Sequence, residues 1–439
     1  TKFIICNADE GDPGAFSDRY LLEHQPHSVL FGMLISGYVT GAKYGILYIR
    51  AEYPESVTIV QNAIKELEKN HLIGSNIKGS NFSFNFKIIQ AQGSYICGEE
   101  TALINSIEGQ RPEVRVRPPF PAQKGLFNKP TTVNNVETLA ALHYIISNGG
   151  QAWKDIGTER SSGTKLVSLD SFFNNPGMYE VEMGTSLSHV IYELGGGFKS
   201  KVKAVQIGGP LGGLVPISKI GDLTLDFESF SQEGFLMGHA SVVSVPHDYP
   251  IMKFIEHLFD FAAYESCGKC FPCRLGTKRG HELAEKALQS NYKIDRKLFT
   301  DLLTTLEQGS LCAHGGGIPL PVRNALVEMV SGKEKTLPGE KYYIPGSVMQ
   351  ITLDNEYKAN WGMHKNADVY FNASPVFKLL PDAIARKELV PLAWYASDKT
   401  LRSGWAFGQS YLQDGIAAFE AKSCPVTKSF SSLSIKKYI

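Results

Sequence analysis

The chain has 439 residues, and its 44 Lys and Arg balance its 44 Asp and Glu, so the formal net charge is zero. This balance argues against nucleic acid or an anionic membrane as the main partner. No apolar run reaches the length of a membrane span and no signal-like stretch opens the sequence, so we expect no direct membrane insertion. Seven cysteines do not resemble a disulfide framework, which favours reduced thiols in the cytoplasm.

The first 150 residues alternate between strand-like and helix-like patterns. Short β-rich apolar runs predict strands at 2–6, 44–50 and 82–89, and helical spacing predicts helices at 27–42, 55–70 and 98–107. Such alternation is typical of α/β folds with a largely parallel, Rossmann-like sheet that binds ligands at the carboxyl ends of its strands. We therefore predict an α/β domain over residues 1–150.

Two loops in this domain collect glycines and carboxylates beside strand ends, at 6–19 and 92–101. Glycine lets the backbone approach a ligand closely, and N–H groups at a helix start attract negative oxygens. Carboxylates in such loops suit ribose or ribityl hydroxyls better than phosphates, which they repel. Turns followed by helix caps explain the same residues, so the pattern alone leaves both interpretations open.

Three further regions follow. Short strands and glycine turns predict a small α+β module over 161–245, and helical spacing predicts a helical domain over 250–332. Three of the four tryptophans, Trp361, Trp394 and Trp405, lie beyond position 338. This change of composition predicts a separate C-terminal module over 338–439.

The helical region contains an unusual cysteine cluster. Cys267, Cys270 and Cys273 are separated by two residues each, and a lone Cys312 follows at a distance. This spacing suits the corners of a [4Fe–4S] cluster, which transfers single electrons, and it indicates a redox enzyme. A structural zinc site is the main alternative, although zinc usually draws its ligands from two separated pairs, and a packing role is a third.

Six motifs occur in order along residues 1 to about 330. They are Asn7-Ala-Asp-Glu-Gly-Asp-Pro-Gly14, Gly93-Ser-Tyr-Ile-Cys-Gly-Glu-Glu-Thr-Ala-Leu103, Pro118-Pro-Phe-Pro121, Pro130-Thr-Thr-Val-Asn-Asn-Val-Glu-Thr138, Glu265-Ser-Cys-Gly-Lys-Cys-Phe-Pro-Cys-Arg274 and Leu311-Cys312. Together they resemble the NADH-binding flavoprotein subunit of respiratory complex I and its soluble relatives in NAD-linked hydrogenases and formate dehydrogenases.

The resemblance implies FMN, NAD(H) and a [4Fe–4S] cluster as cofactors. The positions that match flavin contacts are Asn7, Asp9, Glu10, Tyr95, Gly98, Glu99, Asn134 and Asn135. Those that match NADH contacts are Asp12, Glu100, Arg117 and Phe120, and those that match cluster ligands are Cys267, Cys270, Cys273 and Cys312. Residues 161–245 resemble a ubiquitin-like ligand-binding module.

The function implied is NADH dehydrogenase electron input: hydride from NADH to FMN, then single electrons through the cluster. A small [2Fe–2S] thioredoxin-like subunit and a larger redox complex are the implied partners, in the cytoplasm or peripheral to the inner membrane. No catalytic acid or base is implied, and Cys6 and Cys97 are interpreted as packing residues. Asp12 and Glu100 would repel an extra phosphate and favour NADH over NADPH.

Two departures from the family pattern create further expectations. The family's glycine- and arginine-rich phosphate loop lies upstream of the Asn7 motif, so we expect this N-terminally truncated polypeptide to bind FMN weakly or not at all by itself. Residues 338–439 instead resemble, weakly, the non-catalytic tail of a zinc-carboxypeptidase-like family, with His364 as the only histidine after position 338. An iron–sulfur scaffold without turnover, either truncated or a chimera joined near residue 335, is therefore an alternative, and a zinc hydrolase is a third.

Overall fold

The structure is a computed structural model that describes residues 1–91, 93–290, 292–331, 334–336, 347–353, 364–371, 377–379, 389–395, 401–403 and 416–421. The chain divides into two compact units. The first comprises Thr1–Glu282 and Asp301–Ala325, and the second comprises Leu283–Thr300 and Leu326–Ile439. Among the described helices, none is both long enough and apolar enough to cross a bilayer.

The first unit begins with a four-stranded sheet. Its strands are β1 (Phe3–Ala8), β2 (Tyr44–Ile49), β3 (Asn85–Gln90) and β4 (Thr131–Asn135), in the order β3-β2-β1-β4. Every pairing is parallel, which confirms the predicted parallel sheet. Because β4 adds on the side of β1 opposite to β2, the strand order reverses between β1 and β4, where α/β sheets place their ligands.

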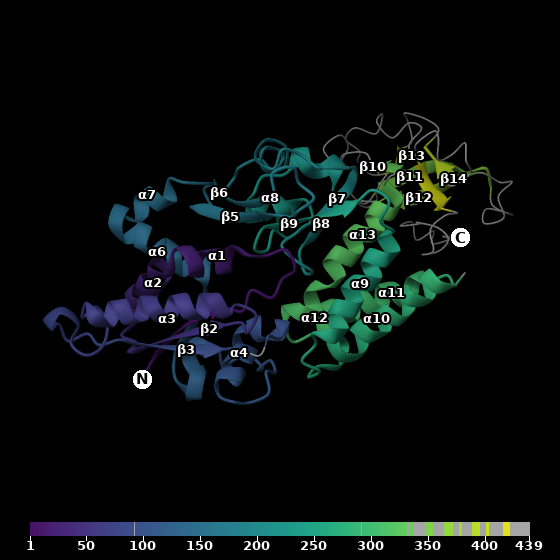
Figure 1. Cartoon of the computed structure of the whole chain (residues 1–439). Coiled ribbons are helices and arrows are strands. Elements are labelled where there is room, and N and C mark those ends of the chain that lie inside the picture. The colour runs from purple at the N-terminus through teal and green to yellow at the C-terminus, as the bar shows by residue number, and fades with distance from the viewer. Residues whose placement is uncertain are drawn as a thin grey trace. The chain divides into compact units, whose positions relative to one another are not determined.

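Alternating side chains bury both faces of this sheet. Ile4 and Cys6 point into a core formed with α1 (Ser17–His24), α2 (Pro26–Thr40), α3 (Pro54–Lys69) and α6 (Val136–Asn148). Ile5 and Tyr48 point into a second core with α4 (Glu100–Ile107). Figure 1 shows α3 and α4 on opposite sides of β2 and β3. The short helices α5 (Pro121–Lys124) and α7 (Gly150–Lys154) complete the region.

Two predicted elements begin more than one residue later than their sequence patterns indicated. The strand predicted at 82–89 starts at Asn85, because the buried ring of Phe84 fills the space beside Gly37 and Gly45, while its backbone forms an isolated bridge with Gly74. The helix predicted at 98–107 starts at Glu100, after a 3-10 turn over Tyr95–Gly98. Hydrophobic periodicity did not predict the short β4 or α1.

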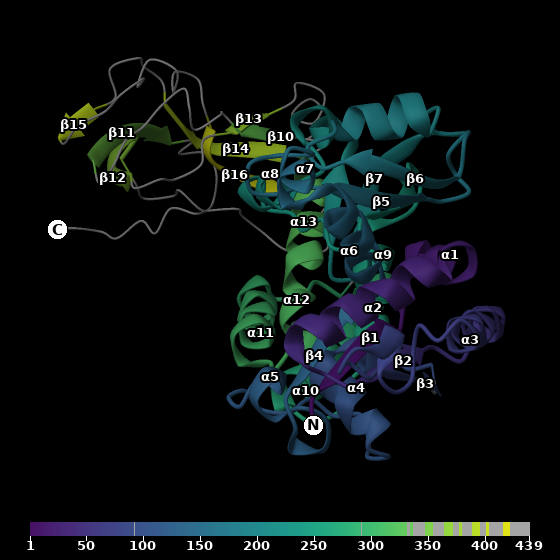
Figure 2. The ribbon, with the colours of Figure 1, turned by 90° about the vertical axis from the view of Figure 1, so that its left-hand side faces the viewer.

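The next part of the first unit is a five-stranded sheet. Its strands are β5 (Thr164–Leu169), β6 (Gly177–Glu182), β7 (Val202–Ile207), β8 (Gly213–Pro216) and β9 (Ser241–Pro246), in the order β6-β5-β9-β7-β8. Figure 2 shows β5, β6 and β7 of this sheet. The central pair β5 and β9 is parallel and the other pairs are antiparallel. This order agrees with the predicted ubiquitin-like module. A π-helix over His189–Leu194 and helix α8 (Phe227–Gln232) pack on its core.

The described residues that follow are mainly helical, as the sequence pattern predicted for 250–332. The helices are α9 (Ile251–Tyr264), α10 (Phe271–Gln289), α11 (Arg296–Gly309), α12 (Ala313–Gly317) and α13 (Pro319–Ser331). The three closely spaced cysteines lie at the junction of α9 and α10, and Cys312 immediately precedes α12. The exact domain boundaries stay a prediction.

The second unit contains an antiparallel sheet. Its strands are β10 (Glu334–Thr336), β11 (Ser347–Leu353), β12 (Asn366–Phe371), β13 (Phe377–Leu379), β14 (Leu389–Trp394), β15 (Leu401–Ser403) and β16 (Ile416–Ala421). The tail motifs at 343–355, 372–377 and 401–409 lie partly or mostly outside the described residues. The likeness to a zinc-carboxypeptidase tail stays a prediction.

Candidate cofactor site

A cavity of about 1200 Å³ opens at the carboxyl ends of β1 and β4. The loop after β1, the turn over Tyr95–Gly98 and the start of α6 form one part of its wall. The ubiquitin-like module contributes Lys165 and His239, and the turn after Cys312 contributes Ala313 and His314. The cavity therefore lies where the reversal of strand order predicts a ligand site.

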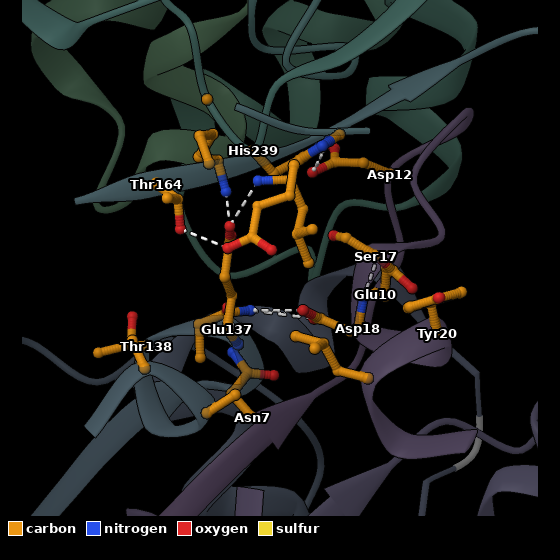
Figure 3. Close-up of a pocket in the computed structure, with 18 of the residues that line it drawn as sticks. Asn7, Glu10, Asp12, Ser17, Asp18, Tyr20, Glu137, Thr138, Thr164 and His239 are labelled. Atoms are coloured by element: carbon orange, nitrogen blue, oxygen red, sulfur yellow. Dashed lines mark hydrogen bonds and ion pairs between the residues drawn. The ribbon is translucent and has the colours of Figure 1, made fainter. Parts of the chain in front are cut away.

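Eight of the twelve predicted flavin and nucleotide contacts line this cavity. They are Asn7, Asp9, Glu10, Asp12, Tyr95, Gly98, Glu99 and Asn135. The other four do not line it: Asn134 is half-buried in β4, the ring of Phe120 is exposed, and Glu100 forms an ion pair with Arg117. Figure 3 shows Glu10 and Asp18 side by side, with Asp12 and His239 facing each other further along the wall.

The carboxylate of Glu10 is held on all sides by its own chain. It accepts backbone N–H bonds from Asp18 at 2.9 Å and Arg19 at 3.1 Å. The hydroxyls of Ser17 and Tyr53 donate to it at 3.2 and 3.1 Å. Charge-assisted hydrogen bonds to backbone N–H groups are strong, so Glu10 fixes the loop after β1 against the start of α1.

Asp9 is in the opposite situation. It is buried, and its Oδ2 has no hydrogen-bond partner among the described residues. Burial raises the pKa of Asp9 to about 7, with Glu52 and Glu265 adding to the rise and Arg50 opposing it. A buried cavity-lining oxygen without a partner is costly unless a ligand completes it. Asp9 therefore fits a ligand with hydroxyl or N–H groups, as FMN has.

Small residues keep the backbone close to this carboxyl. A Cβ at Gly98 would lie 3.4 Å from Asp9 Oδ2, and one at Gly11 would lie 2.9 Å from the ring of Tyr95. The amide of Asn7 donates to the Gly98 carbonyl at 2.8 Å, which ties the two predicted flavin loops together. The two loops therefore form one continuous surface.

Glu99 and Glu100 have partners within the protein. Glu99 accepts bonds from the N–H groups of Thr101 and Ala102, both at 2.9 Å, so it caps α4. Glu100 Oε1 lies 2.6 Å from a guanidinium nitrogen of Arg117. Helix capping was the simpler interpretation of this pair from sequence, and it holds for Glu99.

The ubiquitin-like module places His239 against Asp12, with His239 Nε2 2.9 Å from Asp12 Oδ2. Within the described residues, His239 Nε2 has no hydrogen-bond partner, so this contact is close but does not have hydrogen-bond geometry. Sequence reasoning missed His239, because it lies in a turn that resembles no motif and is more than two hundred positions from Asp12.

Folding brings the turn of the distant Cys312 onto the cysteine loop. A Cβ at Gly315, three residues after Cys312, would lie 2.7 Å from Cys273 Cβ. Cys267 and Cys312 pack against the same small apolar cluster, formed by Ile96, Ala102 and Val114. Burial raises the pKa of Cys273 to about 11; the Ser266 hydroxyl acts to lower it, whereas Cys270, Cys312 and Cys267 add to the rise. The four thiols therefore lie near one another.

The four cysteines fit a metal cluster, because a cluster binds thiols in their ionised form. Thiolates are the ligands of iron–sulfur clusters, and a bound cation overcomes the cost of ionising neighbouring buried thiols. Within the described residues, no group of three or more His, Cys, Asp or Glu is arranged to hold a single ion. One zinc ion would need its sulfurs about 3.8 Å apart, whereas a wider four-iron cube holds them further apart.

A single turn separates the cavity from the thiols. The backbone N–H of Tyr95 donates to Glu265 Oε2 at 2.9 Å, and the Tyr95 ring lies 5.5 Å from that of His314. Tyr95 and His314 line the cavity, while the adjoining Ile96 packs on Cys267 and Cys312. Glu265 lies two residues before Cys267, and His314 lies two residues after Cys312. This proximity in sequence was the only indication that the two residues belong to the site.

Comparisons with known proteins agree with this geometry. Residues 1–144 match the family model described as the Nuo51 FMN-binding domain. Residues 253–330 match the model described as the NADH-ubiquinone oxidoreductase-F iron-sulfur binding region. The first match covers the motifs around Asn7 and Tyr95 in the cavity wall, and the second covers the four cysteines.

Individual relatives are similar over most of the chain. The NADP-reducing hydrogenase subunit HndC of Solidesulfovibrio fructosivorans is 42% identical over 358 residues, which are 80% of this chain and 73% of that protein. An NADH-quinone oxidoreductase subunit of Rhizobium meliloti is 38% identical over 328 residues, 74% of this chain and 78% of that protein.

A crystal structure of an NAD+-reducing [NiFe]-hydrogenase in the H2-reduced state has a similar fold. It matches with a TM-score of 0.67 and 34% identity over 74% of this chain. The match covers 55% of the hydrogenase chain, so this protein spans about half the length of that structure.

Proposed function

Since the chain belongs to the family of NADH-quinone oxidoreductase and hydrogenase subunits that carry these FMN-binding and iron–sulfur regions, we propose that it is the electron-input subunit of an NADH:acceptor oxidoreductase. The observation that carries the proposal is the cavity at the β1–β4 reversal, which adjoins four gathered cysteines across one turn. Such a short separation suits electron transfer from a two-electron donor to a one-electron carrier.

The proposed roles follow the resemblance to the family, and eight of the twelve flavin and nucleotide positions line the cavity. FMN would contact Asn7, Asp9, Glu10, Tyr95, Gly98, Glu99, Asn134 and Asn135, and NADH would contact Asp12, Glu100, Arg117 and Phe120. Cys267, Cys270, Cys273 and Cys312 would bind the [4Fe–4S] cluster. When bound, the flavin accepts a hydride and the cluster accepts electrons singly.

The residues of the chain bind, orient and shield rather than react. Glu10 fixes the loop after β1, and Asp9 is a carboxyl that holds a proton near neutral pH and so donates or accepts a hydrogen bond. The Tyr95 turn separates the cavity from the thiols. No side-chain acid or base is required for hydride transfer.

Both relatives named above are subunits, which supports a place in a larger redox complex. The finer part of the proposal is a small [2Fe–2S] thioredoxin-like partner in the cytoplasm or at the inner membrane. Large exposed side chains flank the cysteine loop: Tyr264 is 86% exposed, Phe271 67% and Leu275 58%. An apolar surface beside an electron-carrying centre supports a docking partner there.

Reconstitution tests the proposal. The chain is supplied with iron, sulfide and FMN, and NADH-dependent reduction of ferricyanide and of viologen is measured. We expect iron to bind, flavin in excess to bind weakly, and NADH to reduce both dyes. Binding of iron without NADH oxidation would instead support the scaffold without turnover, and zinc in place of iron would favour the hydrolase alternative.

A further inference from the structure

A charged link joins the α/β domain to the ubiquitin-like module at the edge of the cavity. Glu137, in the first turn of α6, accepts the backbone N–H of Leu166 on Oε1 at 2.7 Å. Its other oxygen, Oε2, forms an ion pair with Lys165 Nζ. Glu137 and Lys165 both line the cavity, and Figure 3 shows Glu137 pointing toward the strand that carries Thr164.

The link is too buried to be an ordinary surface ion pair. The side chain of Lys165 is 13% exposed and that of Glu137 is 21% exposed. Strand β5 pairs with β9 only at Ser168 and Leu169, and Glu137 receives the N–H of Leu166 earlier in the strand. A largely buried pair is retained without loss of stability only when its hydrogen bonds are complete, and here the carboxylate receives both a backbone N–H and an ammonium group.

Hydrogen bonds continue from Glu137 to the proposed flavin contacts. The backbone N–H of Glu137 donates to Asn135 Oδ1 at 2.8 Å, and Asn135 Nδ2 donates to Asp18 Oδ2 at 2.9 Å. The backbone N–H of Asp18 then donates to Glu10 at 2.9 Å. An unbroken path therefore runs from β5 of the module to Asn135 and Glu10.

Lys165 offsets the negative charge of the carboxyl groups along this path. Burial raises the pKa of Asp18, and the nearby carboxylates of Glu10 and Glu137 add to the rise, whereas Asn135 and Lys165 act to lower it. Without the ammonium group of Lys165, the carboxylates of Glu10 and Glu137 would lie near Asp18 with no lysine to offset their charge. Mutual repulsion would then displace Asn135, which lies between Glu137 and Asp18.

We propose that Glu137 and Lys165 are positioning residues that lock the ubiquitin-like module to the start of α6 and thereby hold Asn135 where it contacts the flavin. This inference rests on the proposed function, because it assigns the flavin to the cavity. It gives the ubiquitin-like module a role in flavin affinity that acts by way of Asn135.

The test uses the full chain with two variants, Glu137→Gln and Lys165→Met, and the rescue variant Lys165→Arg. The control is Lys219→Met, which removes another lysine of the same module whose 2.8 Å ion pair with Glu233 lies outside the cavity. Flavin dissociation constants come from fluorescence titration, and amide hydrogen exchange at Leu166 is followed without flavin. Glu137→Gln keeps the side-chain shape and an acceptor for Leu166, so it serves if Lys165→Met fails to fold.

We expect Lys165→Met and Glu137→Gln to raise the flavin dissociation constant about tenfold, a loss typical of residues coupled in one network. Leu166 exchange should quicken in Lys165→Met, while Lys165→Arg and Lys219→Met should behave as the parent chain. Unchanged flavin affinity in both folded variants would overturn the inference. If the parent chain binds no flavin even when reconstituted, the proposed function fails, and unchanged Leu166 exchange in Lys165→Met would then overturn the link as well.

Discussion

The loop after β1 and the cysteine loop after α9 meet at the same turn, yet they are stabilised differently. In the first, Glu10 receives four hydrogen bonds from its own chain. In the second, the Cys273 thiol lies 3.3 Å from the Ser266 hydroxyl, and a sulfur contact of this kind is a weak hydrogen bond. The backbone of the cysteine loop is also tied to its surroundings, since Lys269 donates to the Val114 carbonyl at 2.6 Å and Arg111 donates to the Cys267 carbonyl at 3.1 Å. The Glu10 carboxylate is therefore fixed by the protein, whereas the Cys273 thiol itself has only a weak protein partner.

Replacing a thiol should have the largest effect, because each of the four thiols would bind the cluster directly. We expect Cys273→Ser to abolish cluster binding, since the serine oxygen is a poor ligand for iron in a site of buried thiolates. Iron and acid-labile sulfide per chain measure the change. The control is Cys6→Ser, which alters an equally buried cysteine in the sheet core. A Cys273→Ser chain with full iron content would remove Cys273 from the ligand set.

Asp9 offers a test within the flavin wall, where one group lacks a partner. Its folded pKa of about 7 exceeds the ordinary value of 3.8, so the flavin-free folded chain binds the proton more tightly than the unfolded chain. The stability linked to Asp9 is therefore complete below about pH 4 and declines as pH rises to about 7, by up to about 4 kcal/mol.

Asp9→Asn should remove this pH dependence. Urea unfolding at pH 4.5 and pH 8 should show the variant gaining stability relative to the parent chain at the higher pH. Parallel pH profiles for the two chains would show that Asp9 ionises normally in the fold. Flavin bound to the parent chain should reduce the difference in stability between the two chains, because the ligand would give Asp9 Oδ2 a hydrogen-bond partner.

Loss of the Glu10 charge should disturb the loop that its carboxylate fixes. We expect Glu10→Gln to weaken flavin binding by about 2 kcal/mol, because bonds to charged groups contribute about 1.5–3 kcal/mol each and the amide still replaces part of them. Flavin titration measures this. Glu23→Gln is the matched control, since Glu23 also accepts side-chain bonds from Arg19 and Ser56 but lies outside the cavity. Equal flavin affinities in the two variants would show that the loop does not need this carboxylate.

The smallest effect is expected at Phe120, whose ring is 54% exposed. As a stacking surface for a nucleotide base, it should contribute about 1–3 kcal/mol to NADH binding and little to folding. We expect Phe120→Ala to raise KM for NADH about tenfold with the melting temperature nearly unchanged. Phe127→Ala removes another exposed ring and should leave KM as it is. A KM that moves equally in both variants would argue against stacking.

What the sequence predicted well was local. The spacing of the cysteines and the alternation of strands and helices are local features that do not depend on tertiary packing. The cysteine group and the parallel sheet could therefore be predicted from them. Elements set by tertiary contacts were not visible: Phe84 leaves the predicted strand because its ring fills the space beside two glycines. Likewise, Lys165 and His239 reach the cavity only through the placement of a separate module, which no motif encodes.

The turn at Tyr95 has a consequence for how the metal and flavin sites are loaded. Its backbone is anchored by Glu265, two residues before the first cysteine, and its neighbour Ile96 lies against two of the thiols. Iron entering the cysteine loop would stiffen the anchor on which one wall of the flavin cavity rests. Because such coupling is reciprocal, iron binding and flavin binding would promote each other, and iron-starved cells would accumulate a chain deficient in both cofactors.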